Sequence, residues 1–171
     1  SYLAPILHAL GMSILVHDPS VVAIDERFER AGLAELLQRS DVVLPLAPGI
    51  DETRNLIDAA ALATMKPGAF LVNVSRGELV DEVAVADALD SGRLGGLAID
   101  VGRAPDQRPQ LELARRPGVV ATPHLGGLTP ENADDQARSS VEQVRAILGH
   151  VMPPRSVNPD HATRLRRYWT R

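Results

Sequence analysis

The apolar residues of this 171-residue chain fall into short continuous runs, and helical segments separate these runs. Such runs, in place of strict alternation, are typical of strands that are buried on both faces of a parallel sheet. We predict strands over residues 13–19, 41–46, 70–72, 97–101 and 119–122. We predict helices over residues 1–10, 33–38, 58–65 and 81–92. The order of strands and helices predicts an α/β fold, in which helices cover a parallel sheet.

The C-terminal part of the chain departs from this pattern. A long helix is predicted from Thr129 to about Gly149, since Thr129 is a favourable N-cap and Pro130 suits the first helical position. Its apolar stripe consists of Val141, Val144, Ile147 and Leu148. The tail over residues 151–171 is basic and contains prolines. We interpret it as a segment that crosses into another domain or as a mobile end.

Composition excludes several classes of function. The net charge is −4 and the two signs are interspersed, which argues against a nucleic-acid partner. There is no cysteine, and the five histidines show no metal-ligand spacing, so we predict no disulfide and no metal site. No apolar run approaches the ~20 residues of a membrane span, and no signal peptide is visible. These observations predict a soluble, cytoplasmic protein without a membrane partner.

The segment over residues 71–81 is the most informative. Its buried strand breaks into a polar turn that carries Arg76, and a helix then starts at Asp81. Ligands of open parallel sheets bind at the carboxyl ends of strands, where an arginine donates two N–H groups to a carboxylate. The alternative is that Arg76 only caps a neighbouring helix or pairs on the surface. This segment alone leaves both interpretations open.

Polar residues follow four of the predicted strands. They are Asp18, Arg76, Asp100 and His124. Because the carboxyl ends of parallel strands meet at one edge, we expect all four at the same edge of one sheet. Each has a structural alternative: an aspartate after a strand is a common turn former, and a lone histidine is often structural. Asp100 within an apolar strand requires hydrogen-bonding partners, and the convergence of the four residues favours a ligand site.

Three motifs resemble those of the D-isomer-specific 2-hydroxyacid dehydrogenase family in order and spacing. They are Asn-Val-Ser-Arg-Gly over residues 73–77, Gly-Gly-Leu-Ala-Ile-Asp-Val over residues 95–101 and Thr-Pro-His-Leu-Gly-Gly over residues 122–127. The resemblance extends from Ser1 to about Asn158. It implies a Rossmann-type, doubly wound parallel sheet that binds NAD. It also implies hydride transfer between the nicotinamide and a 2-keto or D-2-hydroxy acid.

The resemblance also implies roles for individual residues. Arg76 matches the arginine that binds the substrate carboxylate, and His124 matches the acid/base that exchanges a proton with the carbonyl oxygen. Asp18 matches the acidic residue on the adenosine ribose, where its charge would repel the 2′-phosphate of NADP. Arg76 and His124 also line the cofactor in the family, and the other matching positions are Ala47, Val74, Ser75, Asp100 and Gly126.

One departure from the family concerns the partner of the histidine. The family has a glutamate five residues after the position of Asp100, and this chain has Pro105 there. Asp106 lies one residue later and is our candidate replacement as the third catalytic residue. The alternative is an ordinary Pro-Asp turn.

A second departure concerns the start of the domain. The glycine-rich loop G-x-G-x-x-G, expected just before Ser1, does not occur in the sequence, and the first strand and the N-terminal substrate-domain portion are also missing. Without the loop, no helix N-terminus holds the pyrophosphate. We therefore expect a truncated NAD-binding domain over residues 1–128, a crossover helix over residues 129–150 and a tail over residues 151–171 that returns towards the substrate domain. Such a fragment is expected to be inactive alone.

Three hypotheses on function follow. The first is an NAD-dependent D-2-hydroxyacid dehydrogenase that acts on a small 2-keto or 2-hydroxy acid and forms a homodimer through its nucleotide domain. The second is a non-catalytic NAD-sensing protein on the same fold, similar to the C-terminal-binding-protein corepressors. Arg76 and His124 do not separate these two, since such corepressors keep the catalytic residues. The third is a truncated or degenerate chain without activity.

Overall fold

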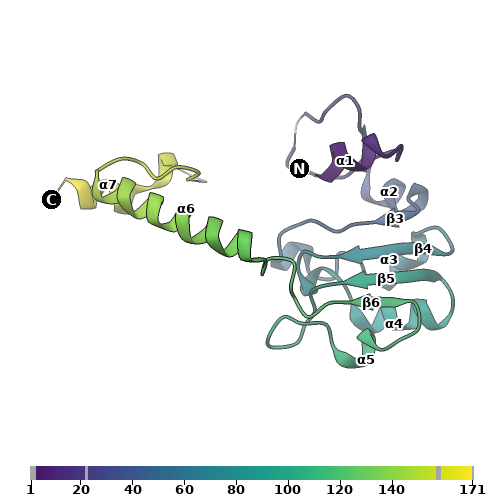
Figure 1. Ribbon diagram of the computed structural model, residues 1–171. Helices are drawn as coiled ribbons and strands as arrows, with labels where there is room; N and C mark the ends of the chain where they lie inside the picture. Colours follow the sequence, from purple (N-terminus) through teal and green to yellow (C-terminus); the bar gives the residue numbers. More distant parts are fainter. Residues whose placement is uncertain (1–2, 22, 157–158, 171) are drawn as a thin grey trace. The chain divides into compact units, whose positions relative to one another are not determined.

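The computed structural model describes residues 3–21, 23–156 and 159–170. The chain divides into two compact units, one that ends at His124 and one that begins at Leu125 (Figure 1). The predicted division into residues 1–128, 129–150 and 151–171 stays a prediction.

A four-stranded sheet forms the centre of the first unit. Its strands lie in the order β3 (Val42–Val43), β4 (Ala69–Asn73), β5 (Leu94–Ile99) and β6 (Val119–Ala121) (Figure 1). All three pairings are parallel, and Val72 of β4 lies opposite Ala98 of β5 in the register. The predicted parallel α/β fold is therefore confirmed.

The first predicted strand does not join this sheet. Residues Leu15–Val16 form β1, which pairs with the unpredicted strand β2 (Glu29–Arg30) in a separate parallel sheet. The expectation of one continuous sheet was thus wrong for the described residues. A hydrophobic run predicts that a segment is a strand but does not predict which strand it pairs with. Strand β2 has no such run, because both of its residues are charged. Backbone hydrogen bonds from Glu29 N to Ile14 O and from Ala31 N to Val16 O, each 3.0 Å long, hold β2 against β1. The exposed Arg39 guanidinium beside Glu29 lowers the pKa of the Glu29 carboxyl.

Helices connect the strands as the sequence predicts, with small changes at their ends. Asp58 and Asp81 are N-caps whose carboxylates accept hydrogen bonds from the first helical turn. The helices of this unit are α1 (Leu3–Ala9), α2 (Leu33–Arg39), α3 (Ala59–Thr64), α4 (Glu82–Asp90) and α5 (Leu111–Ala114), with short 3-10 helices η1 (Asp51–Thr53) and η2 (Gly77–Leu79). Helix α5 was not predicted, because it lies in a loop rich in proline and arginine.

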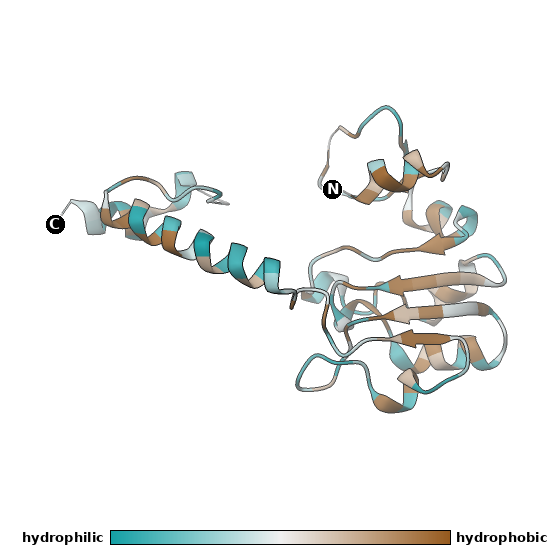
Figure 2. Ribbon diagram, viewed as in Figure 1, coloured by the Kyte–Doolittle hydropathy of each residue, from teal (hydrophilic) through white to brown (hydrophobic). Residues whose placement is uncertain are grey.

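The core lies against one face of the four-stranded sheet. Successive side chains of a strand point to opposite faces, and on β4 Leu71 and Asn73 are buried whereas Phe70 is 51% exposed. Val120 of β6 is also exposed. Figure 2 shows that hydrophobic residues predominate along the strands of this sheet. The helices that contribute buried side chains to the core are α2, α3, α4 and α5. The expectation that both strand faces are buried was therefore wrong within the described residues.

The second unit consists of the long helix α6 (Pro130–Leu148), the 3-10 helix η3 (Pro159–His161) and helix α7 (Thr163–Trp169). Thr129 is the N-cap of α6, as predicted, and its Oγ1 accepts a hydrogen bond from Asn132 N over 3.2 Å. Trp169 donates its Nε1–H to Ile147 O over 2.8 Å and stacks on His150, so the predicted tail contains a helix that packs on the end of α6. None of the described helices combines the length and the apolarity that crossing a membrane requires.

Candidate active site

The turn after β4 is held by the side chain of a buried asparagine. Asn73 Nδ2 donates a hydrogen bond to Arg76 O over 2.9 Å, and Asn73 Oδ1 accepts one from Ser75 N over 3.2 Å. Ser75 Oγ donates to Ala47 O over 3.2 Å, which joins the turn to the loop after β3. The sequence analysis includes Asn73 in the motif over residues 73–77 but does not predict this structural role. An asparagine two residues before a serine is a common local turn signal that points to it.

The Arg76 guanidinium lacks an acidic partner in the part of the chain that the structure describes. Its Nη1 donates only to Ser75 O, over 2.7 Å, and no ion pair involves it. The Arg76 backbone forms the N-cap of η2, and its side chain makes no capping hydrogen bond. Neither structural alternative for this side chain therefore applies to the described residues. Most of its donors remain available for a carboxylate.

The ends of β4, β5 and β6 are linked by short contacts. Asp100 N donates to Asn73 O over 3.1 Å, and Thr122 Oγ1 donates to a carboxylate oxygen of Asp100, which is 7% exposed. Asp100 therefore follows β5 as a satisfied, buried carboxylate. His124 follows β6 in a left-handed conformation with φ of 60°, and its N–H bonds to Thr122 O over 3.0 Å. The structure thus places Arg76, Asp100 and His124 after three adjacent strands at one edge.

The structure gives Asp106 local partners. Its Oδ1 accepts a hydrogen bond from Arg108 N over 3.2 Å, and its Oδ2 lies 3.5 Å from Arg108 Nε. The carboxylate is exposed, and within the described ranges it makes no hydrogen bond to His124. These are the contacts of a turn residue. A catalytic role for Asp106 stays a prediction.

The remaining candidate residues lie in four separate segments of the chain. Asp18 follows β1 of the separate two-stranded sheet, and its Oδ1 accepts a hydrogen bond from Ser20 N over 2.9 Å, as in an aspartate turn. Ala47 is half-buried in the loop after β3, and Val74 is 53% exposed at the end of β4. Gly126 belongs to the second unit.

The comparisons with known proteins decide the family. The model of the D-isomer specific 2-hydroxyacid dehydrogenase, NAD binding domain, matches residues 1–126. The chain belongs to the D-isomer specific 2-hydroxyacid dehydrogenases. The chain is 42% identical over 146 residues to (S)-sulfolactate dehydrogenase of Chromohalobacter salexigens. The aligned segment covers 82% of this chain and 47% of that protein.

Solved structures of the family have the same fold. The chain superposes on a D-isomer specific 2-hydroxyacid dehydrogenase from Polaromonas with a TM-score of 0.81 and 26% identity, over 89% of this chain and 48% of the other. For D-lactate dehydrogenase from Aquifex aeolicus, complexed with NAD and lactic acid, the TM-score is 0.75 and the identity 28%, over 86% and 50% of the two chains. These likenesses confirm the Rossmann-type fold. The chain spans about half the length of these dehydrogenases.

NAD is the cofactor of this dehydrogenase domain, and the residues at the sheet edge fit it. Val74 and Ala47 are apolar and at least partly exposed at the carboxyl ends of the strands, the edge at which open parallel sheets bind ligands. The Oδ2 of Asp18 accepts no hydrogen bond among the described residues, so it remains available to a ribose hydroxyl. No group of three histidine or acidic side chains that is suited to a metal ion occurs in the described segments.

Proposed function

We propose that the intact protein is an NAD-dependent dehydrogenase that interconverts 2-keto acids and D-2-hydroxy acids. One observation carries this proposal. The Arg76 guanidinium, without an acidic partner in the described part of the chain, follows β4, and His124 follows β6 at the same edge of the sheet. A cation for the substrate carboxylate and an acid/base for its carbonyl are the two protein groups that the reaction requires.

The proposed roles follow from the chemistry of each side chain. Arg76 donates two N–H groups to the substrate carboxylate and thereby orients the neighbouring carbonyl. NAD, when bound, supplies or accepts the hydride at the substrate C2. His124 gives a proton to the carbonyl oxygen during reduction and takes it from the hydroxyl during oxidation. Asp18 binds the adenosine ribose, and the other cofactor-lining residues are Ala47, Val74, Ser75, Asp100 and Gly126.

Asp106 has two possible roles that one pair of variants separates. As the carboxylate behind His124, it would stabilise the protonated imidazole and aid proton exchange. As a turn residue, it only orders the loop through Arg108. Asp106→Ala removes both functions, whereas Arg108→Ala removes only the ion pair across the turn. A larger loss of kcat in Asp106→Ala than in Arg108→Ala indicates the catalytic role.

The test of the proposed function is NADH oxidation by the intact protein with a panel of 2-keto acids, including glyoxylate, hydroxypyruvate and 3-sulfopyruvate. We expect turnover with at least one acid and a loss of about 10²–10⁴-fold in His124→Ala. The expected result for Arg76→Met is a strongly raised KM for the keto acid.

Tight NADH binding without turnover on any acid would contradict the dehydrogenase proposal and favour the NAD-sensing alternative. A homodimer through the nucleotide domain and a cytoplasmic location also stay proposals. The oligomeric state of the intact protein is measured by sedimentation.

A further inference from the structure

Two loops of the candidate site pack against each other through glycines. Gly77 directly follows Arg76, and Gly102 begins the loop that carries Asp106. A Cβ atom on Gly77 would lie 2.2 Å from Gly102 O, so only a glycine allows this approach. The turn of Arg76 and the loop of Asp106 are therefore in direct backbone contact.

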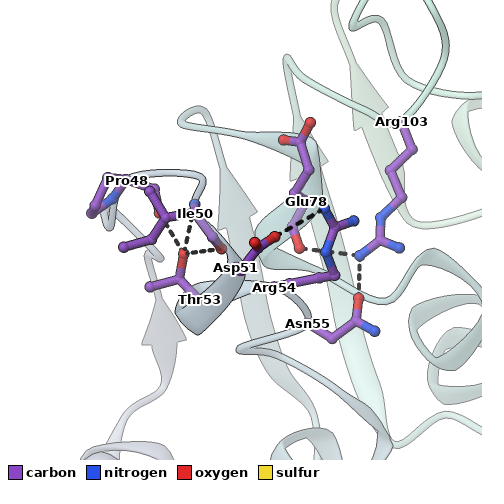
Figure 3. A network of polar contacts seen from close by, with 8 residues as sticks. All are labelled: Pro48, Ile50, Asp51, Thr53, Arg54, Asn55, Glu78 and Arg103. Carbon is purple, nitrogen blue, oxygen red and sulfur yellow. Dashed lines mark hydrogen bonds and ion pairs between the residues drawn. The ribbon is translucent and has the colours of Figure 1, made fainter.

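The side chain of Arg103 spans this contact. Its Nη2 donates to Glu78 O over 3.1 Å and to the Asn55 side-chain oxygen, and its Nε lies 3.5 Å from Gly77 O (Figure 3). The Arg103 backbone N–H donates to Glu82 Oε1 over 3.0 Å. No carboxylate pairs with the Arg103 guanidinium in the described residues. Its hydrogen bonds all go to uncharged carbonyl and amide oxygens.

The two backbone acceptors of Arg103, Gly77 O and Glu78 O, belong to the segment that immediately follows Arg76, and its third acceptor, the Asn55 side chain, lies in the loop before α3. Glu78 O also accepts a hydrogen bond from Asn55 N over 2.9 Å, and Ile57 N donates to Leu79 O over 2.9 Å. The loop before α3 therefore runs along η2, and Arg103 fastens the two together. On the other side of the turn, Asn73 holds Arg76 O. The turn is thus held on the strand side by Asn73, which binds Arg76 O, and on the other side by Arg103, which binds Gly77 O and Glu78 O.

We propose that Arg103 is a positioning residue for Arg76, which holds the turn after β4 in the geometry that binds the substrate carboxylate. This inference rests on the proposed function. A planar guanidinium has several donors in a fixed fork, and it bridges Gly77 O, Glu78 O and the Asn55 side chain at once. The single ammonium of a lysine cannot reproduce this bridge, and a methionine has no donor.

The test is steady-state kinetics of the intact protein with Arg103→Met, Arg103→Lys and a control, Arg116→Met. Arg116 is an arginine of the same unit whose guanidinium pairs with Asp90, and it makes no hydrogen bond to the turn of Arg76 in the described part of the chain. We expect Arg103→Met to raise the KM for the 2-keto acid about tenfold, the effect of losing charge-assisted hydrogen bonds. The KM for NADH should change less than twofold, and Arg103→Lys should restore part of the loss.

A double-mutant cycle tests whether Arg103 acts through Arg76. In an Arg76→Met background, Arg103→Met should have no further effect on kcat/KM, because the side chain that it positions is already absent. Equal losses in both backgrounds would overturn the inference.

Two other outcomes are decisive. Unchanged KM in Arg103→Met and Arg103→Lys, with normal turnover of the wild type, would overturn the positioning role and leave the proposed function intact. If the wild type turns over no 2-keto acid, the proposed function fails and the inference fails with it. Should Arg103→Met not fold, Arg103→Lys alone decides, because a lysine with wild-type KM shows that the fork is not needed.

Discussion

Asn73 and Gly77 fix the turn that presents Arg76. Asn73 uses both ends of its buried amide within the turn, and Gly77 allows the backbone to touch the loop that starts at Gly102. Within the described residues, the side chain of Arg76 itself makes a single hydrogen bond, to Ser75 O. At the scale of single residues, the site is therefore held by neighbours that have no part in the chemistry.

Gly77→Ala should destabilise the protein by about 1–3 kcal/mol, because the new methyl group collides with Gly102 backbone that has to shift. The measurement is urea-induced unfolding followed by circular dichroism. The matched control is Gly127→Ala, where the added Cβ lies 3.8 Å from Asn132 Nδ2, an ordinary van der Waals distance. We expect the control to change stability by less than about 0.5 kcal/mol. Equal effects of the two substitutions would contradict the close packing of the loops.

Among the elements, α6 shows how a helix start is encoded locally. Thr129 caps the helix and Pro130 occupies its first turn, both as the sequence predicts. The apolar stripe predicted for α6 is present, yet Val141, Val144 and Leu148 are all more than half exposed within the described structure. The sequence therefore predicts the helix and its apolar stripe, but it does not predict which surface packs against that stripe.

Thr129→Ala should weaken α6 by about 1 kcal/mol, since Asn132 N loses its side-chain acceptor. Hydrogen exchange of the amides in the first turn of α6 measures this, and we expect faster exchange there. Ser140→Ala is the control within the same helix, because Ser140 Oγ only donates back to Gln136 O. Slower or unchanged exchange after Thr129→Ala would refute the cap.

At the scale of the whole molecule, the sequence contains the residues that we propose for the ring, ribose and substrate parts of the site, and it contains no G-x-G-x-x-G motif. We therefore expect the isolated 171-residue polypeptide to bind NADH weakly in calorimetry, because no helix N-terminus at such a loop receives the pyrophosphate. A protein that also contains residues upstream of Ser1 serves as the comparison. Tight binding by the isolated polypeptide would show that the loop is dispensable.

Features that depend on neighbouring residues were predicted well from the sequence, and features that depend on residues far apart in the chain were not. The helix over residues 58–65 and the cap at Asp81 were predicted closely, because they depend on neighbours in the chain. Strand β2 was missed because polar residues form it and backbone hydrogen bonds to residues some fifteen positions earlier hold it, about the span of one crossover connection. Asp100 was predicted inside a strand and lies just after β5, where Thr122 satisfies it. The contacts of Asp106 with Arg108 depend on loop geometry that no motif specifies.

The amino-acid sequence by itself determined the class of fold, the family and the order in which Arg76, Asp100 and His124 follow their strands. These features depend on hydrophobic runs, capping residues and motif spacing, all of which are local. Only the tertiary structure decided that β1 stands in a separate sheet, that one face of the central sheet is exposed and that Arg103 fastens the turn of Arg76. Each of these depends on hydrogen bonds or packing between segments far apart in the chain. The hydrophobic periodicity of the sequence does not indicate which distant segments make contact.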